Sequence, residues 1–360
     1  MRMRALQELD STRFQTVTIL GQLARTNRKL AELKGLVSSI PNESILVNTL
    51  GLQEAKDSSA IESIVTTHDE LFRSVAFPGD ESGAAKEVAR YAKALHTGFE
   101  LVTKQGLLAT RQVVDVQAVL EPSRSGFRKV PGTTLKDDRG RVVYTPPSPE
   151  LIPQLMSDLD RFLNDAELFD ADPVIKMALA HHQFESIHPF YDGNGRTGRI
   201  LCVLYLVKEQ LLDLPVLYLS RHIVRTTSDY YRLLQDVRER DSWEAWVLYM
   251  LTAVERTSAE GIATVKAIRE ALLRVKHRVR KDYKFYSQDL INNIFTHPYT
   301  KIAFVQQDLG VERLTATRYL DALASGGVLR KKRVGRSNYY INVELVRILT
   351  GKAMTGVENG

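Results

Sequence analysis

The helical spacing of its apolar residues is the feature that most restricts how this chain can fold. In residues 87–102 the apolar positions recur every three or four residues, which places them on one face of an amphipathic helix. Residues 151–164 and 172–187 show the same spacing, and the second segment opens on an Asp-Pro pair, which is typical of a helix start. A longer helical tract follows from residue 242 past residue 275. The fold class predicted is therefore mainly α.

One segment interrupts the helical pattern. Residues 127–130 (FRKV) and 141–144 (RVVY) are short and β-prone, and the residues between them are rich in turn formers. We expect a β-hairpin over 127–144 with a long tip. Because an isolated two-stranded hairpin is marginally stable, it should lie against the helical body.

The C-terminal part, residues 283–346, combines helical and strand patterns. It predicts a helix, a turn at Leu309-Gly310, a second helix from about Leu314, and two strands around a basic turn. That order is typical of a winged helix-turn-helix domain. Such domains bind DNA, form dimers or dock proteins, and the sequence does not separate these uses. The residues that could contact phosphates or bases are Arg313, Thr315, Thr317, Arg318 and the basic run 330–336.

Composition limits the setting in which the chain works. With 360 residues, 44% hydrophobic and 26% charged, it has the size of two or three globular domains. Cys202 is the single cysteine, which excludes a disulfide framework and a thiolate metal cluster and fits a cytoplasmic location. No apolar run is long enough to cross a membrane, so no membrane partner is expected. The formal net charge of +6 is concentrated in 274–284 and 330–336, which are solvated surface or sites for anionic partners.

The stretch HPFYDGNGRTGR, residues 188–199, supports two interpretations. From Gly193 it fits the G-x-G-x-x-G pattern of dinucleotide-binding folds. That fold needs a strand before the glycines and an acidic residue after the next strand. Here the glycines follow a helical segment, and the downstream Asp213 lies at a helix end. We therefore reject the dinucleotide interpretation.

The second interpretation is an anion site at a helix start. Gly193 and Gly195 allow successive backbone N–H groups to point inward, and the following helix adds its N-terminal amides and dipole. Arg196 and Arg199 lie three residues apart and share a helix face, where their guanidinium groups suit phosphate oxygens. The stretch therefore predicts a phosphate-binding site.

Two further residues in the stretch supply chemistry. Asp192 is a hard oxygen ligand, suited to Mg²⁺ bridging phosphates. His188 is the one side chain there that exchanges a proton near neutral pH. A phosphate cradle, a cation ligand, a charge clamp and a base are the parts of phosphoryl or nucleotidyl transfer.

The same stretch resembles the signature of the Fic family, H-P-F-x-D/E-G-N-G-R-x-x-R, at every defined position. Fic enzymes are α-helical and usually transfer AMP from ATP to a protein hydroxyl. The resemblance implies that His188 is the catalytic base, that Asp192 holds Mg²⁺, and that Phe190 anchors the loop in the core. It implies that Asn194 and Arg196 grip the α- and β-phosphates and that Arg199 holds the γ-phosphate. The nucleotide-binding residues implied are Asp192, Gly193, Asn194, Gly195, Arg196, Thr197, Gly198, Arg199 and Tyr231.

The resemblance also gives the hairpin a role. The segment 127–144 is similar to the Fic flap, which holds the protein substrate by strand addition. A surface hairpin without a partner explains the same pattern. Tyr230 and Tyr231 fall where Fic proteins place residues near the adenine, and Tyr231 could stack there.

Residues 53–67 (QEAKDSSAIESIVTT) form the second informative stretch. Taken locally, Ser59-x-x-Glu62 is a capping box that would start a helix. Beside a Fic signature, Ser58 and Glu62 resemble the family's inhibitory motif, [S/T]-x-x-x-E-[G/N], on an inhibitory helix at about 54–67. Ser63 departs from the usual Gly or Asn. The resemblance implies that Glu62 pairs with Arg199 and so excludes the γ-phosphate.

These observations predict an N-terminal helical region (1–110), a Fic catalytic core with its flap (111–275) and a winged-helix domain (283–346). The family resemblance covers about 54–270 and implies a protein adenylyltransferase that uses ATP and Mg²⁺ and is autoinhibited by Glu62. The alternatives are a DNA-binding regulator, a Fic enzyme that removes AMP, and one with another donor. Self-modification and a homodimer stay open.

Overall fold

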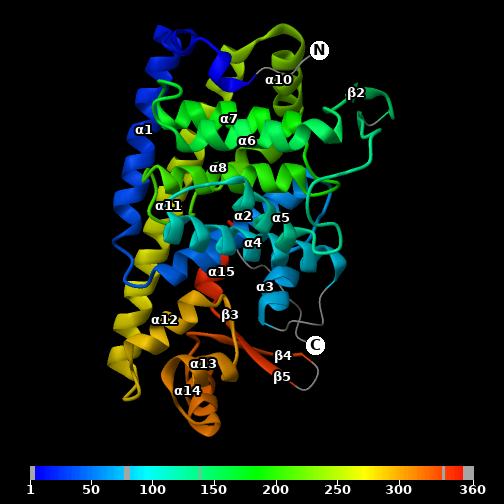
Figure 1. Ribbon diagram of the computed structural model, residues 1–360. Helices are drawn as coiled ribbons and strands as arrows, with labels where there is room; N and C mark the ends of the chain where they lie inside the picture. The colour runs from blue at the N-terminus through cyan, green and yellow to red at the C-terminus, as the bar shows by residue number, and fades with distance from the viewer. Residues whose placement is uncertain (1–4, 77–81, 138, 335–336, 352–360) are drawn as a thin grey trace.

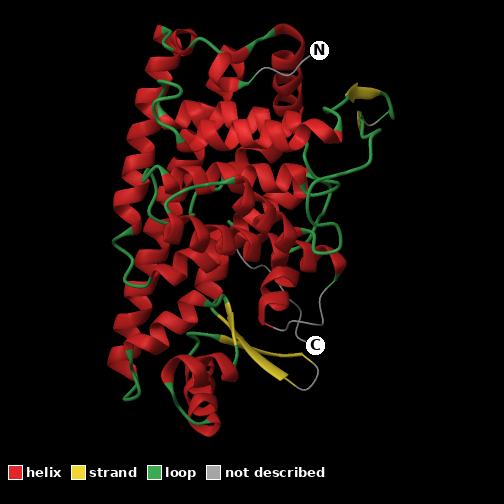
Figure 2. Ribbon diagram, in the orientation of Figure 1, coloured by secondary structure: helices red, strands yellow, loops and turns green. Residues whose placement is uncertain are grey.

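Helices make up most of the protein, as the apolar spacing predicts (Figures 1 and 2). The computed structural model describes residues 5–76, 82–137, 139–334 and 337–351. The N-terminal helices are α1 (Val17–Val37), α2 (Glu43–Ile61), α3 (His68–Ala76) and α4 (Gly83–Gln105). The central helices are α5 (Thr110–Leu120), α6 (Ile152–Asn164), α7 (Pro173–Ile187), α8 (Asn194–Lys208), α9 (Leu219–Arg225), α10 (Thr227–Arg240) and α11 (Trp243–Asp282).

The centre of the molecule is formed by α7 and α8. Every residue of α7 from Val174 to Ile187 is buried, and so is most of α8, because α4, α5, α6 and α11 pack around this pair. Asp172 caps α7 by accepting a hydrogen bond from the Val174 N–H, and Pro173 occupies its first turn, as expected. The loop between α7 and α8 carries the stretch that predicted an anion site.

The N-terminal region places α2 against the central helices. Helix α1 runs along α11 at one edge of the molecule, and α2 packs on α4 and α9 (Figure 1). The inhibitory helix predicted at 54–67 is wrong at both ends, since α2 spans 43–61. It starts at the Asn42 cap and ends before Ser63, whose φ of 64° is left-handed. The capping-box interpretation of Ser59 and Glu62 is also wrong, because these residues lie where the helix ends.

The predicted hairpin is present, but its first strand is displaced. The strands are β1 (Leu135–Lys136) and β2 (Val142–Tyr144), which pair antiparallel. Residues 127–130 form no strand of the hairpin. The N–H groups of Lys129 and Val130 donate to the Tyr191 hydroxyl, and Phe127 makes an isolated bridge with Phe190. These residues therefore fix the base of the hairpin to the loop after α7.

The C-terminal region has the order of elements that the sequence predicts. It contains α12 (Gln288–Thr296), β3 (Tyr299–Thr300), α13 (Ile302–Leu309), α14 (Arg313–Ser325), β4 (Arg330–Val334), β5 (Ser337–Ile341) and α15 (Val343–Thr350). The three strands form one antiparallel sheet in the order β3-β5-β4. Residues 335–336 of the basic run lie outside the described residues. Among the helices described, none combines the length and apolar character needed to cross a membrane.

Candidate active site

The loop between α7 and α8 is shaped by two left-handed residues. His188 ends α7 with a φ of 50°, and its N–H donates to the Phe184 carbonyl. Gly193 starts α8 with a φ of 76°, a conformation that glycine adopts without a steric cost. Between them Phe190 is completely buried. The loop therefore turns the chain sharply at one fixed point of the core.

Asn194 holds this loop together. Its side chain accepts a hydrogen bond from the Phe190 N–H and donates one to the Phe190 carbonyl, both at 2.9 Å. The residue is buried, and its amide is occupied by the loop itself. A grip of Asn194 on phosphate, as the family resemblance implies, would therefore come from its backbone N–H at the start of α8.

Arg196 and Arg199 lie buried on one face of α8, and the carboxylate of Glu62 lies between them. Glu62 accepts from Arg196 Nε at 2.7 Å and from Arg199 Nη2 at 2.8 Å. The Glu62 side chain is 24% exposed, whereas both arginine side chains are about 2–3% exposed. The expected contact of Glu62 with Arg199 is present, and the contact with Arg196 adds to it.

Other carboxylates surround Arg196. Glu121, just after α5, accepts from Arg196 Nη2 at 2.9 Å, and Glu87 of α4 lies 3.6 Å from Nη1. Asp192 lies 3.5 Å from Nη2. Glu87 and Glu121 are more than seventy residues from Arg196 in sequence, and no local pattern indicated them. Four acidic side chains thus neutralise the one arginine.

Helix α2 presents a polar face to this site. Glu54, Ser58 and Glu62 are spaced four residues apart and so lie on one side of the helix. Ser58 accepts from Arg199 Nε at 2.7 Å, and its carbonyl accepts from Arg199 Nη2 at 3.0 Å. Glu54 is completely buried and accepts from Tyr91 and Ser220, and burial raises its pKa to about 7. This face fixes the position of α2 opposite the arginines.

The two other glycines of the stretch, Gly195 and Gly198, allow neighbouring side chains to approach the backbone of α8 closely. A Cβ on Gly195 would lie 2.6 Å from Glu62 Oε1, so a side chain there would displace the carboxylate. A Cβ on Gly198 would lie 2.5 Å from Glu185 Oε1, which shows how tightly α7 and α8 pack. Thr197 is buried and its N–H donates to the Gly193 carbonyl. Gly198 thus allows α8 to pack closely on α7, and the Thr197 N–H makes a backbone hydrogen bond in the first turn of α8.

His188 lies in a partly buried, cationic setting. Burial lowers the pKa of His188 to about 4, and the positive charges of Arg128 and Arg238 act in the same direction. Its Nδ1 is buried and has no hydrogen-bond partner in the part of the chain that the structure describes. The ring is therefore neutral at physiological pH and able to accept a proton.

Arg128 is a positioning residue that the sequence did not single out. It is almost completely buried, and its guanidinium donates to the carbonyls of His188, Ile187 and Pro147. Its own N–H donates to the Pro189 carbonyl at 2.9 Å. A cation at the last carbonyls of α7 also complements the helix dipole. Arg128 thereby connects the base of the hairpin to the backbone of His188.

The hairpin is held at its other end by β2. The Tyr144 hydroxyl donates to the Ser186 carbonyl, and the Arg238 guanidinium lies 3.9 Å from the centre of the Tyr144 ring. Gln235 of α10 donates to the Val143 carbonyl. Both ends of the hairpin are thus attached next to His188.

Asp192 is the most accessible acidic group of the loop. Its side chain is 53% exposed, and its Oδ1 accepts from the Gly193 N–H at 2.7 Å. Within the described part of the chain, no group of three or more His, Cys, Asp or Glu residues is arranged to hold a metal ion. Mg²⁺ keeps several waters and commonly takes one protein carboxylate together with substrate phosphates. The single accessible carboxylate of Asp192 fits that donor set.

The two tyrosines of α10 have different environments. Tyr230 is buried and its hydroxyl lies 2.9 Å from His181 Nε2, which makes it a core residue. Tyr231 is 51% exposed, and its ring meets Tyr230 edge-on with centroids 5.2 Å apart. Tyr231 therefore carries a half-exposed aromatic ring at the position expected near an adenine.

Some of the C-terminal residues that could contact DNA are exposed, and one is already paired within the chain. Arg313 and Arg318 lie on the surface of α14, but Lys331 forms an ion pair with Asp321 at 2.6 Å. Lys331 also lies over the Tyr340 ring. Binding of DNA by this region stays a prediction.

Fold and site together define a class: a helical protein in which two buried arginines at a helix start pair with a carboxylate of the same chain. Residues 20–100 match the family model described as Fic/DOC family N-terminal, and residues 108–206 match the Fic/DOC family model. Together these two matches cover half of the chain. The chain belongs to the Fic/DOC family. Residues 272–345 match a third model, the C-terminal domain of protein adenylyltransferases described as SoFic-like.

Known relatives support the same assignment. The chain is 31% identical over 130 residues to protein adenylyltransferase fic-1 of Caenorhabditis elegans, covering 36% of this chain and 24% of that protein. It is 32% identical over 166 residues to protein adenylyltransferase Fic of Drosophila erecta, covering 44% of this chain and 32% of that protein. The chain thus spans no more than about a third of these relatives.

Solved structures show the fold. A Fic family protein from Desulfovibrio desulfuricans superimposes with a TM-score of 0.57 at 21% identity, covering 91% of this chain and 96% of that chain. A fragment of Fic-1 from Caenorhabditis elegans gives a TM-score of 0.53 at 22% identity, covering 69% and 74%.

Proposed function

We propose that this protein is a protein adenylyltransferase that transfers AMP from ATP to a protein hydroxyl and is held back by Glu62. The observation that carries the proposal is the buried pair Arg196 and Arg199, which share one internal carboxylate beside the neutral His188. Two buried guanidinium groups at a helix start are suited to phosphates, and a carboxylate between them occupies the place of an anion.

The autoinhibition follows from competition for the same donors. Arg199 gives its Nη2 to Glu62 and its Nε to Ser58, so a γ-phosphate has to replace the carboxylate to reach it. The negative charge of Glu62 also repels a triphosphate. Removal of Glu62 would release Arg196 Nε and the bond from Arg199 Nη2 to the carboxylate, and withdrawal of α2 would release the Ser58 bonds to Arg199 as well. Glu121 would still pair with Arg196 Nη2.

Magnesium fits the residues that are present. Asp192 would hold the ion, with the remaining ligands coming from the phosphates of ATP and water. The ion would neutralise charge on the phosphates when it is bound. The short contact of Asp192 Oδ1 with the Gly193 N–H keeps this carboxylate next to the helix start.

In the proposed reaction the target hydroxyl attacks the α-phosphorus of ATP. A new bond forms between the hydroxyl oxygen and phosphorus, the bond from the α-phosphorus to the bridging oxygen breaks, and pyrophosphate leaves. The hydroxyl proton goes to His188 Nε2, because Nδ1 is buried. Arg128 keeps the imidazole in place by holding the His188 carbonyl.

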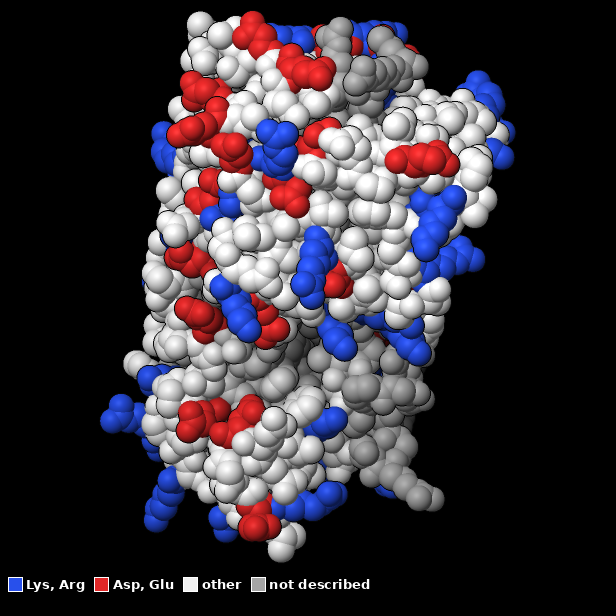
Figure 3. Space-filling model, in the orientation of Figure 1, with Lys and Arg blue, Asp and Glu red and all other residues white. Residues whose placement is uncertain are grey.

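The protein substrate would lie along the hairpin. Val142 and Val143 of β2 are 54% and 44% exposed, and a two-stranded sheet has free edges that can accept an added strand. Basic side chains gather on the side of the molecule where the hairpin lies (Figure 3). An extended segment with apolar and acidic residues suits this surface.

The proposal is tested by incubating the Glu62→Gly protein with ATP, Mg²⁺ and a cell lysate, followed by mass spectrometry. We expect AMP on protein hydroxyls with Glu62→Gly and none with Glu62→Gly combined with His188→Ala. Intact mass of the enzyme itself reports self-modification. Equal labelling with and without His188, or a transferred group of another mass, would contradict the proposal. The single buried Cys202 supports action in the cytoplasm, while dimerisation and DNA binding stay predictions.

A further inference from the structure

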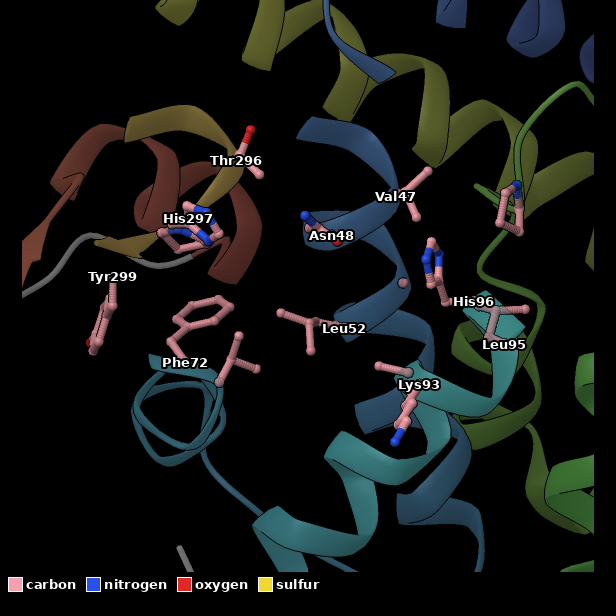
Figure 4. A pocket seen from close by; sticks show the side chains of 15 residues that line it. Val47, Asn48, Leu52, Phe72, Lys93, Leu95, His96, Thr296, His297 and Tyr299 are labelled. Atoms are coloured by element: carbon pink, nitrogen blue, oxygen red, sulfur yellow. The ribbon is translucent and has the colours of Figure 1, made fainter. Parts of the chain in front are cut away.

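A cavity of about 320 Å³ lies on the side of α2 where its first turns meet α3, α4 and the α12–β3 junction (Figure 4). Its buried wall is apolar and aromatic. Phe72 and Leu52 face each other across the space, and Leu95 and Tyr299 close its sides. The cavity is separate from the arginine site, since it is lined by none of the residues 188–199.

The opening of the cavity is polar and carries one cation among the described lining residues, Lys93. Lys93 and His96 lie three residues apart on α4 and are both exposed, with His297 on the opposite wall. Lys93 forms no ion pair with any residue that the structure describes, whereas His96 lies 3.3 Å from Glu100. None of the described lining residues is acidic. The charge at the opening therefore favours a negative group on the ligand.

The volume of the cavity limits the size of the ligand. An apolar cavity of about 150 Å³ binds benzene, so 320 Å³ holds a two-ring aromatic body. Cavities of this size, mostly apolar with a few polar groups, are typical of small-molecule sites at domain junctions. We propose that this cavity binds a small aromatic carboxylate, with its rings against Phe72 and Leu52 and its carboxylate at Lys93.

The position of the cavity links it to Glu62, and this second step rests on the proposed function. The two helices that flank Glu62 in the chain, α2 and α3, both line the cavity. Gln53 of α2 lies 3.0 Å from His68 of α3, and Tyr299 donates to Asp69, so the walls are connected to one another. The cavity is present while Glu62 holds the arginines. A ligand that binds this arrangement more tightly than one with Glu62 withdrawn favours it and so weakens ATP binding.

Binding is tested by isothermal titration calorimetry of indole-3-acetate and of its uncharged analogue indole-3-acetamide. We expect the acid to bind at least tenfold more tightly than the amide, and Lys93→Gln to remove that difference. Lys104→Gln, an exposed lysine at the far end of the same helix, is the matched control and should leave it unchanged. Ala92→Phe from α4 and Val75→Trp from α3 fill the cavity from opposite walls, and each should weaken binding at least tenfold.

Both filling variants are checked for folding by their thermal midpoints, and Val75 is 40% exposed, so the larger side chain there avoids the core. Absence of binding at millimolar acid would overturn the site, as would binding that survives both folded filling variants. Equal affinity for acid and amide would overturn the assignment of the carboxylate to Lys93.

The link to Glu62 is measured as ATP affinity in the His188→Ala protein, where no turnover occurs. Saturating indole-3-acetate should weaken ATP binding at least threefold, and this effect should vanish in His188→Ala combined with Glu62→Gly. Unchanged ATP affinity with the acid bound would overturn the link. Because binding of the acid is measured without any transfer reaction, a failure of the proposed adenylyltransferase activity would be seen separately.

Discussion

Replacing Glu62 by glycine should make ATP bind about 100-fold more tightly. The change removes two charge-assisted hydrogen bonds, to Arg196 Nε and Arg199 Nη2, at 2.7 and 2.8 Å. Such bonds contribute about 1.5–3 kcal/mol each, so a triphosphate that displaces the carboxylate forgoes about 3–6 kcal/mol. The Glu62 side chain is one quarter exposed, which screens the pair and favours the lower end. About 3 kcal/mol corresponds to about a hundredfold in affinity.

The assay is isothermal titration of ATP with Mg²⁺ in the His188→Ala background, which prevents turnover. Glu62→Gln keeps the size but removes the charge and should fall between wild type and Glu62→Gly. Glu87→Gln is the matched control, because the Glu87 side chain is 38% exposed and lies 3.6 Å from Arg196. We expect it to change the affinity less than threefold. A folded Glu62→Gly protein whose ATP affinity is within threefold of wild type would refute the competition.

Three further outcomes follow from the site. Arg128→Ala should lower the transfer rate of the Glu62→Gly protein about 10–100-fold, since a small misplacement of a catalytic group has effects of that size. Its ATP affinity should stay within about threefold, and an equal loss of affinity would show that Arg128 does not act through His188. The rate should also persist at pH 5.5, because the lowered pKa of His188, about 4, keeps the ring neutral as pH falls. An ordinary imidazole with a pKa of about 6.5 would be about nine-tenths protonated there, so a tenfold drop in a pH–rate profile would contradict this environment. The free energy of unfolding, measured by urea denaturation, should be about 1 kcal/mol higher for Ser63→Gly than for Ser63→Ala, because the φ of 64° suits glycine. Equal midpoints would show that this turn is relaxed in the wild-type protein.

Local rules in the sequence determined the helices and the helix start that carries the site. Apolar spacing predicts α4, α6 and α7, because one buried face of a helix recurs every 3.6 residues whatever it packs against. The glycines of the stretch 188–199 and the three-residue spacing of its arginines are likewise local, and they place both guanidinium groups on one face of α8. The role of Glu62 came from family resemblance, not from local pattern.

Local rules failed where distant segments compete for the same groups. The strand expected at 127–130 is absent because its N–H groups bond Tyr191, sixty residues away. Contacts of this kind depend on how the helices pack against one another, and no local sequence pattern marks that packing. The same packing brings Glu121 to Arg196 and Arg128 to His188. The sequence by itself therefore determined that two arginines share one face at a helix start, and the tertiary structure decided that the chain's own carboxylate lies between them.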